Sequence, residues 1–337
     1  SEPPSFPFSL PLSLSPGMPY LATLLARSRS LFLALVKVML PVMIAVRAGQ
    51  EMGLVDALGR AIAPAIGWLG LPPEAGMIWV TGVFVGVYGA IGALAGFAPT
   101  LEMSVAQFSA LAAMVLFAHG VPVEQAIVRR AGASFWLTAG LRIGAALAYG
   151  ALVTWACGAA GVLADPVSFD WLQGGAKDAA PGAGGLGDWL ASTAFSLAPT
   201  FGIIVALLVL LDLLERTGIT RRITALMAPV LRVSGLPSAA APVTTVGVLL
   251  GLTYGGALII EEAERQRFAA RTRFLALAWL SLSHALIEDT ALIVALGANV
   301  WIVLVGRVAI TLAVIAVLAR LLDRDDRRDA ALGPNAG

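Results

Sequence analysis

The chain has 337 residues, of which 58% are hydrophobic and only 13% are charged, and its formal net charge is +1 at pH 7. Soluble globular domains are about half apolar and about a quarter charged, so this composition predicts an integral membrane protein in contact with a lipid bilayer. The near-neutral charge excludes a basic surface for nucleic acid, and the single cysteine, Cys157, excludes an intrachain disulfide and a cysteine-based zinc site.

The N-terminal segment, residues 1–30, is predicted to precede the first membrane segment. Its residues 1–17 are rich in Pro and Ser, contain no Lys or Arg, and come before Met18. A secretory signal peptide begins with a basic region, which is missing here. We therefore expect a disordered extension on the cytoplasmic side, either native or added during cloning.

Membrane segments follow, and each needs about 20 mostly apolar residues. Six clear candidates are residues 31–49, 77–98, 133–157, 196–215, 239–260 and 300–322. Four more apolar segments are interrupted, 52–69 and 219–235 by an Ala-Pro pair, and 104–131 and 272–298 by a polar break. Such breaks are tolerated at membrane depth only where protein or water satisfies the freed backbone groups, so they are predicted to point inward.

An internal repeat explains these pairs, because one shift of 165 residues superimposes two halves of the chain. The shift places His119 on His284, the only two histidines, and also superimposes Trp136 on Trp301 and Arg142 on Arg307. Gapless agreement of rare residue types indicates a duplication. The predicted parts are a first repeat at 31–157, an external Gly/Ala/Asp-rich loop at 158–195, a second repeat at 196–322 and a cytoplasmic tail at 323–337.

The placement of Lys and Arg predicts the orientation of the segments. The connection 158–195 has one Lys against four Asp, and it is therefore predicted to be external. If each repeat crosses five times, the basic clusters and both termini lie in the cytoplasm, and the odd number inverts the second copy. The predicted fold class is an all-α integral membrane protein, with about ten segments in two inverted-topology five-segment repeats with broken helices, in a bacterial inner membrane.

Titratable residues in the second repeat are the candidates for an ion site. The stretch SHALIEDTAL carries three of them inside apolar surroundings, and His284 and Glu288, four residues apart, would share one face of a helix. Imidazole and carboxylate groups suit a first-row divalent cation or a proton relay. The expected ion-binding residues are Glu261, Glu262, His284, Glu288 and Asp289, with His119, and the metal ligands His284, Glu288 and Glu262. A structural hydrogen-bond network at a helix break, and surface capping by Glu261 and Glu262, remain alternatives.

The first repeat has different residues at four of these positions. Gly96 and Phe97 stand where the second repeat has Glu261 and Glu262, Val123 stands where it has Glu288, and Glu124 stands where it has Asp289. Neutral and acidic candidates for lining a solute pocket are Thr253, Tyr254, Asn299 and Glu124. Arg142 and Arg307 lie well inside their spans. They are expected either to pair with acids such as Glu124 and Asp289 or to face an anionic substrate group.

Motifs of nucleotide-driven and hydrolytic enzymes do not occur. The chain contains no GxxxxGK[ST], no HExxH and no GxSxG. We therefore expect no enzyme activity and no cofactor, apart from a divalent metal ion as a substrate.

The pattern APxxxxxGLPxxAxxxxxxG occurs as APAIGWLGLPPEAGMIWVTG and again as APVLRVSGLPSAAAPVTTVG. It resembles the membrane Gate domain, or nucleoside-recognition domain, over roughly residues 31–322. Related domains occur in spore maturation proteins and in the membrane part of bacterial ferrous iron transporters. The resemblance implies a solute or ion pathway between two Gate units, and it allows a homodimer.

These observations together predict a transporter that moves a cation, foremost a divalent metal and with proton coupling open, through a site between the two repeats. A transporter for a nucleoside or another small polar solute is the first alternative. A non-transporting membrane scaffold or assembly factor is the second.

Overall fold

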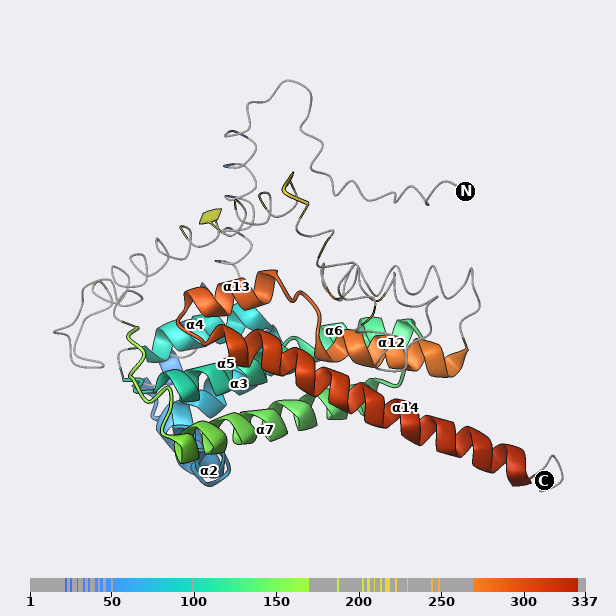
Figure 1. Cartoon of the computed structure of the whole chain (residues 1–337). Coiled ribbons are helices and arrows are strands. Elements are labelled where there is room, and N and C mark those ends of the chain that lie inside the picture. Colours follow the sequence, from blue (N-terminus) through green and yellow to red (C-terminus); the bar gives the residue numbers. More distant parts are fainter. Residues whose placement is uncertain are drawn as a thin grey trace.

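The structure, a computed structural model, describes residues 51–98, 100–169 and 269–332, together with isolated positions between 22 and 49 and between 187 and 248. Within these residues the elements are helices, and the only β-type pairing is an isolated bridge between Ser104 and Pro166. The predicted all-α fold is therefore confirmed for the described part of the chain (Figure 1).

The described helices fall into an N-terminal and a C-terminal group. The first group is α2 (Leu54–Trp68), α3 (Pro73–Val85), α4 (Val87–Phe97), α5 (Val105–Phe117), α6 (Val121–Arg130) and α7 (Phe135–Ala160). The second group is α12 (Ala270–Leu282), α13 (Glu288–Ala295), the π-helix η2 (Trp301–Gly306) and α14 (Arg307–Leu332).

Three helix bounds differ from the sequence predictions. Pro64 does not interrupt its segment but lies inside α2. The segment 77–98, predicted as one span, is broken at Gly86, whose φ of 112° is open to glycine and strained for other residues. The predicted tail also begins as helix, because α14 continues to Leu332.

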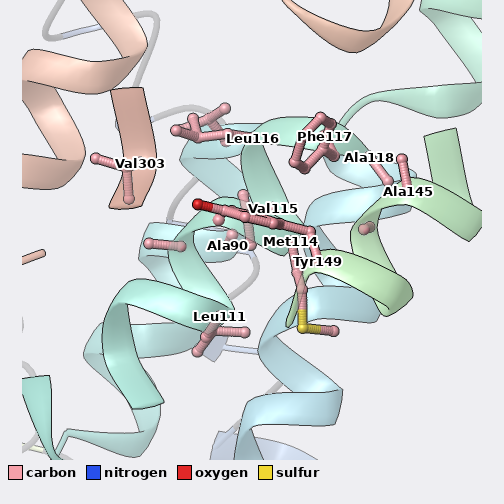
Figure 2. Packing of buried hydrophobic residues seen from close by; sticks show 14 of the residues in the cluster. Ala90, Leu111, Met114, Val115, Leu116, Phe117, Ala118, Ala145, Tyr149 and Val303 are labelled. Carbon is pink, nitrogen blue, oxygen red and sulfur yellow. The ribbon is translucent and has the colours of Figure 1, made fainter. Parts of the chain in front are cut away.

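The core is centred on α5, which is apolar on all sides and buried along nearly its whole length. Figure 2 shows Leu111, Met114 and Phe117 of α5 packed with Tyr149 of α7 and Val303 of η2. A Cβ added at Gly150 of α7 would lie 2.5 Å from the sulfur of Met114, so this glycine permits the close approach of α7 to α5. The helix that leads to His119 is therefore held on several sides.

Equivalent helices in the two halves begin or end 165 residues apart, as the repeat in the sequence predicts. Both ends of α5 and α12 lie 165 positions apart, and so do the last residues of α6 and α13. Left-handed or otherwise positive φ angles also recur at this spacing, at Gly53 and Gly218, Gly120 and Ala285, and Gly132 and Gly297. The described parts of the two halves thus share one local plan.

Equivalent long helices run in opposite directions. The Asn299 N–H donates to Ser109 Oγ, so η2 begins beside the first turns of α5, and Arg271 Nη2 donates to the Ala319 carbonyl, so α14 later passes the start of α12. The helix α7 begins just after Gly132, and Gly132 lies against Arg273 near the start of α12. The other end of α7 lies near the start of α5. The helices α7 and α14 are therefore antiparallel (Figure 1).

Three stretches among the described residues have the length and composition to cross a membrane. They are Val105–Arg130, which contains the break between α5 and α6, Phe135–Ala160, and Trp301–Leu322. Two shorter apolar helices, α3 and α4, lie end to end on either side of Gly86.

Candidate functional site

Two helix ends create the site. The helix α5 begins at a capping box, in which Ser104 Oγ accepts the Gln107 N–H and Gln107 Oε1 accepts the Ser104 N–H. It ends at Phe117, because Gly120 adopts a left-handed conformation and Pro122 lies in the first turn of the next helix, α6. In the other half α12 ends at Leu282, and Ala285 takes the left-handed conformation. A buried histidine follows each end by two residues.

The two histidines meet between the halves. The Nε2 atoms of His119 and His284 are 3.0 Å apart, and both side chains are buried. The Nδ1 atom of each ring lies near the carbonyl oxygen four residues earlier, at 3.0 Å from Val115 and 2.8 Å from Leu280. A carbonyl oxygen only accepts hydrogen bonds, so both Nδ1 atoms carry the proton. These carbonyls belong to the last turns of α5 and α12, where the regular backbone hydrogen bonds between residues four apart end.

Glu124, in the first turn of α6, lies beside both histidines. Its Oε1 is 3.2 Å from Nε2 of His119 and 3.2 Å from Nε2 of His284. Its Oε2 accepts from Arg142 Nη1 at 2.5 Å. One oxygen of this carboxylate is therefore held by the arginine, and the other faces the histidine pair.

Asp289 completes the cluster from the C-terminal half. Its Oδ2 lies 3.8 Å from His119 Nε2, is buried, and has no hydrogen-bond partner among the described residues. Ligand atoms of His119, His284 and Asp289 all lie within 4.8 Å of one another. Each half of the chain thus contributes one histidine and one carboxylate.

Two fully buried arginines hold the helix ends. Arg142 donates through Nε to the Phe117 carbonyl and through Nη2 to the His119 carbonyl. Its repeat equivalent, Arg307, donates to the carbonyls of Leu282, His284 and Leu116, and its Nη1 has no partner in the described part of the chain. Unsatisfied carbonyls are expensive in an apolar interior, so these donors stabilise the breaks that carry the histidines.

Glu288 lies apart from the histidine pair. The expectation that it shares a helix face with His284 is wrong, because α12 ends at Leu282 and α13 begins at Glu288. Instead, Tyr88 Oη of α4 donates to Glu288 Oε1 at 3.2 Å. Asn299 Oδ1 accepts the Trp301 N–H, and this contact places Asn299 at the start of η2.

The remaining predicted residues are Glu261, Glu262, Thr253 and Tyr254, which lie outside the described residues. Sequence reasoning missed two features of the site. Tyr88 was not identified, although a lone phenol in a Gly-rich apolar helix was a signal for a buried hydrogen bond. Glu124 was predicted to line a pocket or to pair with Arg142, and it does pair with Arg142. Its position beside the histidines was missed, although its repeat equivalence with Asp289 pointed to it.

Comparisons with known proteins agree with this membrane architecture. Residues 197–300 match the model of the Gate family, described as nucleoside recognition. The chain is 29% identical over 294 residues to the uncharacterized membrane protein YvoD of Bacillus subtilis (strain 168), and the match covers 84% of this chain and 88% of that protein. No solved structure matches the chain.

The membrane relative and the apolar helices identify a multi-pass membrane protein. The family predicted from the repeated AP…GLP pattern is confirmed by the match to the second half. The second half of the chain, at residues 197–300, carries the sequence signature of the Gate, or nucleoside-recognition, family.

Proposed function

We propose that this protein is an inner-membrane transporter that moves a divalent cation through a site between two inverted Gate repeats. The observation that carries the proposal is the meeting of His119 and His284, one from each half, with Glu124 and Asp289 beside them. Ionisable residues inside a membrane protein are costly and usually mark an ion or substrate pathway. We assign the protein no enzyme activity.

The arrangement of the helices supports ten segments in two inverted repeats. The repeat-equivalent helices α7 and α14 are antiparallel, and helix breaks at equivalent positions lie at the histidines. Trp136 in the first turn of α7 and Trp301 at the start of η2, which leads into α14, are 82% and 71% exposed, and so they lie at opposite ends of the bundle. Tryptophans anchor membrane proteins at both interfaces, and broken helices at the repeat interface are typical of transporter sites.

A nucleoside or another small polar solute is the second candidate substrate, and the nucleoside-recognition description of the family favours it. Under this alternative the neutral residues Asn299, Thr253 and Tyr254 would govern uptake. The histidine pair would then act only as a structural contact between the halves. The two candidates differ in their substrate and in the residues on which uptake depends.

Uptake into proteoliposomes tests the proposal. Purified protein would be compared for uptake of Mn²⁺, Fe²⁺ and Zn²⁺ and of labelled uridine, in the wild type and in the His119→Ala, His284→Ala double variant. Glu102→Gln serves as the control, because Glu102 is an exposed carboxylate remote from the histidines in sequence. We expect metal uptake in the wild type and the control, and its loss in the double variant. Uridine uptake without metal uptake would contradict the proposal.

A further inference from the structure

The histidine pair presents an unusual excess of hydrogen-bond acceptors. Both Nδ1 atoms donate to carbonyl oxygens, so in the neutral rings both Nε2 atoms carry lone pairs. These lone pairs face each other at 3.0 Å, and both face Glu124 Oε1 at 3.2 Å. Three acceptors converge on one buried point, and this arrangement requires a positive species between them.

A proton satisfies this arrangement poorly. A proton on one Nε2 points at only one of the other two acceptors and leaves the third without a donor. Protons on both Nε2 atoms would place two positive rings in contact at 3.0 Å, away from water. A cation that binds all three atoms at once meets neither difficulty.

The distances fit a small metal ion. In a tetrahedral site with bonds of 2.0–2.1 Å, neighbouring ligand atoms are about 3.3 Å apart. The three atoms of this cluster are separated by 3.0, 3.2 and 3.2 Å, within a few tenths of an ångström of that spacing. Asp289 Oδ2 lies 3.8 Å from His119 Nε2 and accepts no hydrogen bond from the residues that the structure describes, so it is the nearest candidate for a fourth ligand.

The surroundings have the form of an outer coordination shell. Histidines that bind metals donate their other ring N–H to a carbonyl or a carboxylate, which fixes the ring and its tautomer. Here Val115 and Leu280 provide these carbonyls, and Arg142 holds the second oxygen of Glu124. The three ligand atoms are therefore oriented before any ion arrives.

We propose that His119 Nε2, His284 Nε2 and Glu124 Oε1, with Asp289 as the fourth ligand, bind one first-row transition-metal ion such as Zn²⁺, Fe²⁺ or Co²⁺. This inference rests on the proposed cation transport, and it narrows the substrate to ions that accept imidazole nitrogen. Mg²⁺ and Ca²⁺ prefer oxygen ligands and are poorly served by a site with two nitrogens. Of the predicted ligand set, His284 is retained, and Glu124 and Asp289 take the place of Glu288 and Glu262.

Metal binding by the purified full chain tests this site without any transport. The chain has only two histidines and one cysteine, so a tag without histidine and a Cys157→Ser background leave His119 and His284 as the only imidazoles and remove the only thiol. Zinc content after dialysis and the visible spectrum of added Co²⁺ give the stoichiometry and the coordination number. X-ray absorption of the zinc-loaded protein reports imidazole ligands directly.

We expect one zinc per chain with two imidazole ligands, four-coordinate Co²⁺, and no displacement by a hundred-fold excess of Mg²⁺ or Ca²⁺. Asp289→Asn, which is isosteric, should weaken binding about 10-fold or more, whereas Glu288→Gln, at the adjacent residue, should leave it unchanged. Loss of zinc in the His119→Ala, His284→Ala variant completes the assignment. The wild-type protein carries the main test, so its zinc content and ligands decide the question even where a variant fails to fold.

Three results would overturn the site: no zinc bound by the wild type, zinc without imidazole ligands, or equal binding by wild type and the double variant. The failure of transport is a separate result. Zinc bound at the histidines with no metal uptake in proteoliposomes would leave the site in place and refute the transporter. Metal uptake with no zinc at the histidines would refute the site alone.

Discussion

The described parts of the two halves use the same backbone plan with different acids. In the N-terminal half, Glu124 reaches Arg142 and forms a close ion pair. In the C-terminal half, the equivalent acid is Asp289, and within the described ranges neither its Oδ2 nor Nη1 of the equivalent arginine, Arg307, has a hydrogen-bond partner. Asp is one methylene shorter than Glu. The duplication thus preserves the scaffold, but the two acids differ in their contacts. Glu124 is held by Arg142, whereas Oδ2 of Asp289 is left for another ligand.

The largest expected difference between the two halves is the loss of folding stability when each arginine is removed. Arg142→Met leaves Glu124 as a buried charge without its partner, and breaking such a pair is expected to destabilise the fold by about 3–5 kcal/mol. Arg307→Met removes donors from three carbonyls but breaks no ion pair among the described residues, so about 1–3 kcal/mol is expected. Reversible unfolding in mixed micelles measures the loss of unfolding free energy in both variants.

The double variant Arg142→Met, Glu124→Gln is the matched control for the first substitution. It removes the buried charge together with its partner, so it should recover part of the stability that Arg142→Met loses. Equal losses for the two arginines, or no recovery in the double variant, would show that the ion pair does not distinguish the halves.

Lengthening the shorter acid should make the halves alike. Asp289→Glu extends the carboxylate by one methylene towards Arg307, and a new hydrogen bond to a charged group is expected to stabilise the fold by about 1.5 kcal/mol. The same change draws an oxygen away from the histidines and should weaken zinc binding. Unfolding and zinc titration of the same sample measure the two effects. A gain in stability that persists in the Arg307→Met background would disprove this explanation.

The smallest expected difference concerns the left-handed residues before α6 and α13. Ala285 has φ of 48° where the first half has Gly120 at 55°. Ala285→Gly should stabilise the fold by about 0.5–1 kcal/mol, and Gly120→Ala should destabilise it by the same amount. These values are net, because the greater conformational freedom of glycine in the unfolded chain offsets part of the relief of backbone strain. A Cβ at position 120 would meet Glu124 no closer than 3.4 Å, so the effect comes from the backbone. Thermal unfolding of both variants should show shifts of opposite sign.

Much of the scaffold was predictable because the duplication repeats rare residues. The pairing of His119 with His284 and of Arg142 with Arg307 was visible in the sequence, and so were the interrupted segments around both histidines. The contact between the histidines was not predicted, since a register shift shows equivalence and not distance. Only the tertiary packing of the described helices brings the two helix ends together.

Local geometry explains the remaining differences. The spacing of His284 and Glu288 suggested one helix face, but the left-handed Ala285 lies between them and turns the two side chains to different partners. The sequence does not predict the break at Ala285, because alanine is a good helix former and rarely adopts the left-handed conformation. Pro64 is the opposite case, since the sequence marks a break that α2 does not have.

The two buried arginines also set the formal charge of the histidine cluster when no ion is bound. Their two positive charges equal the two negative charges of Glu124 and Asp289, so the formal charge of the unloaded cluster is zero. Under the proposed function, a neutral centre lets the unloaded carrier reset, because it avoids the large penalty for moving net charge through a low-dielectric interior. Under the proposed function, only the loaded form is electrogenic. A potential of 100 mV then contributes about 5 kcal/mol per divalent ion, in favour of accumulation on the negative side.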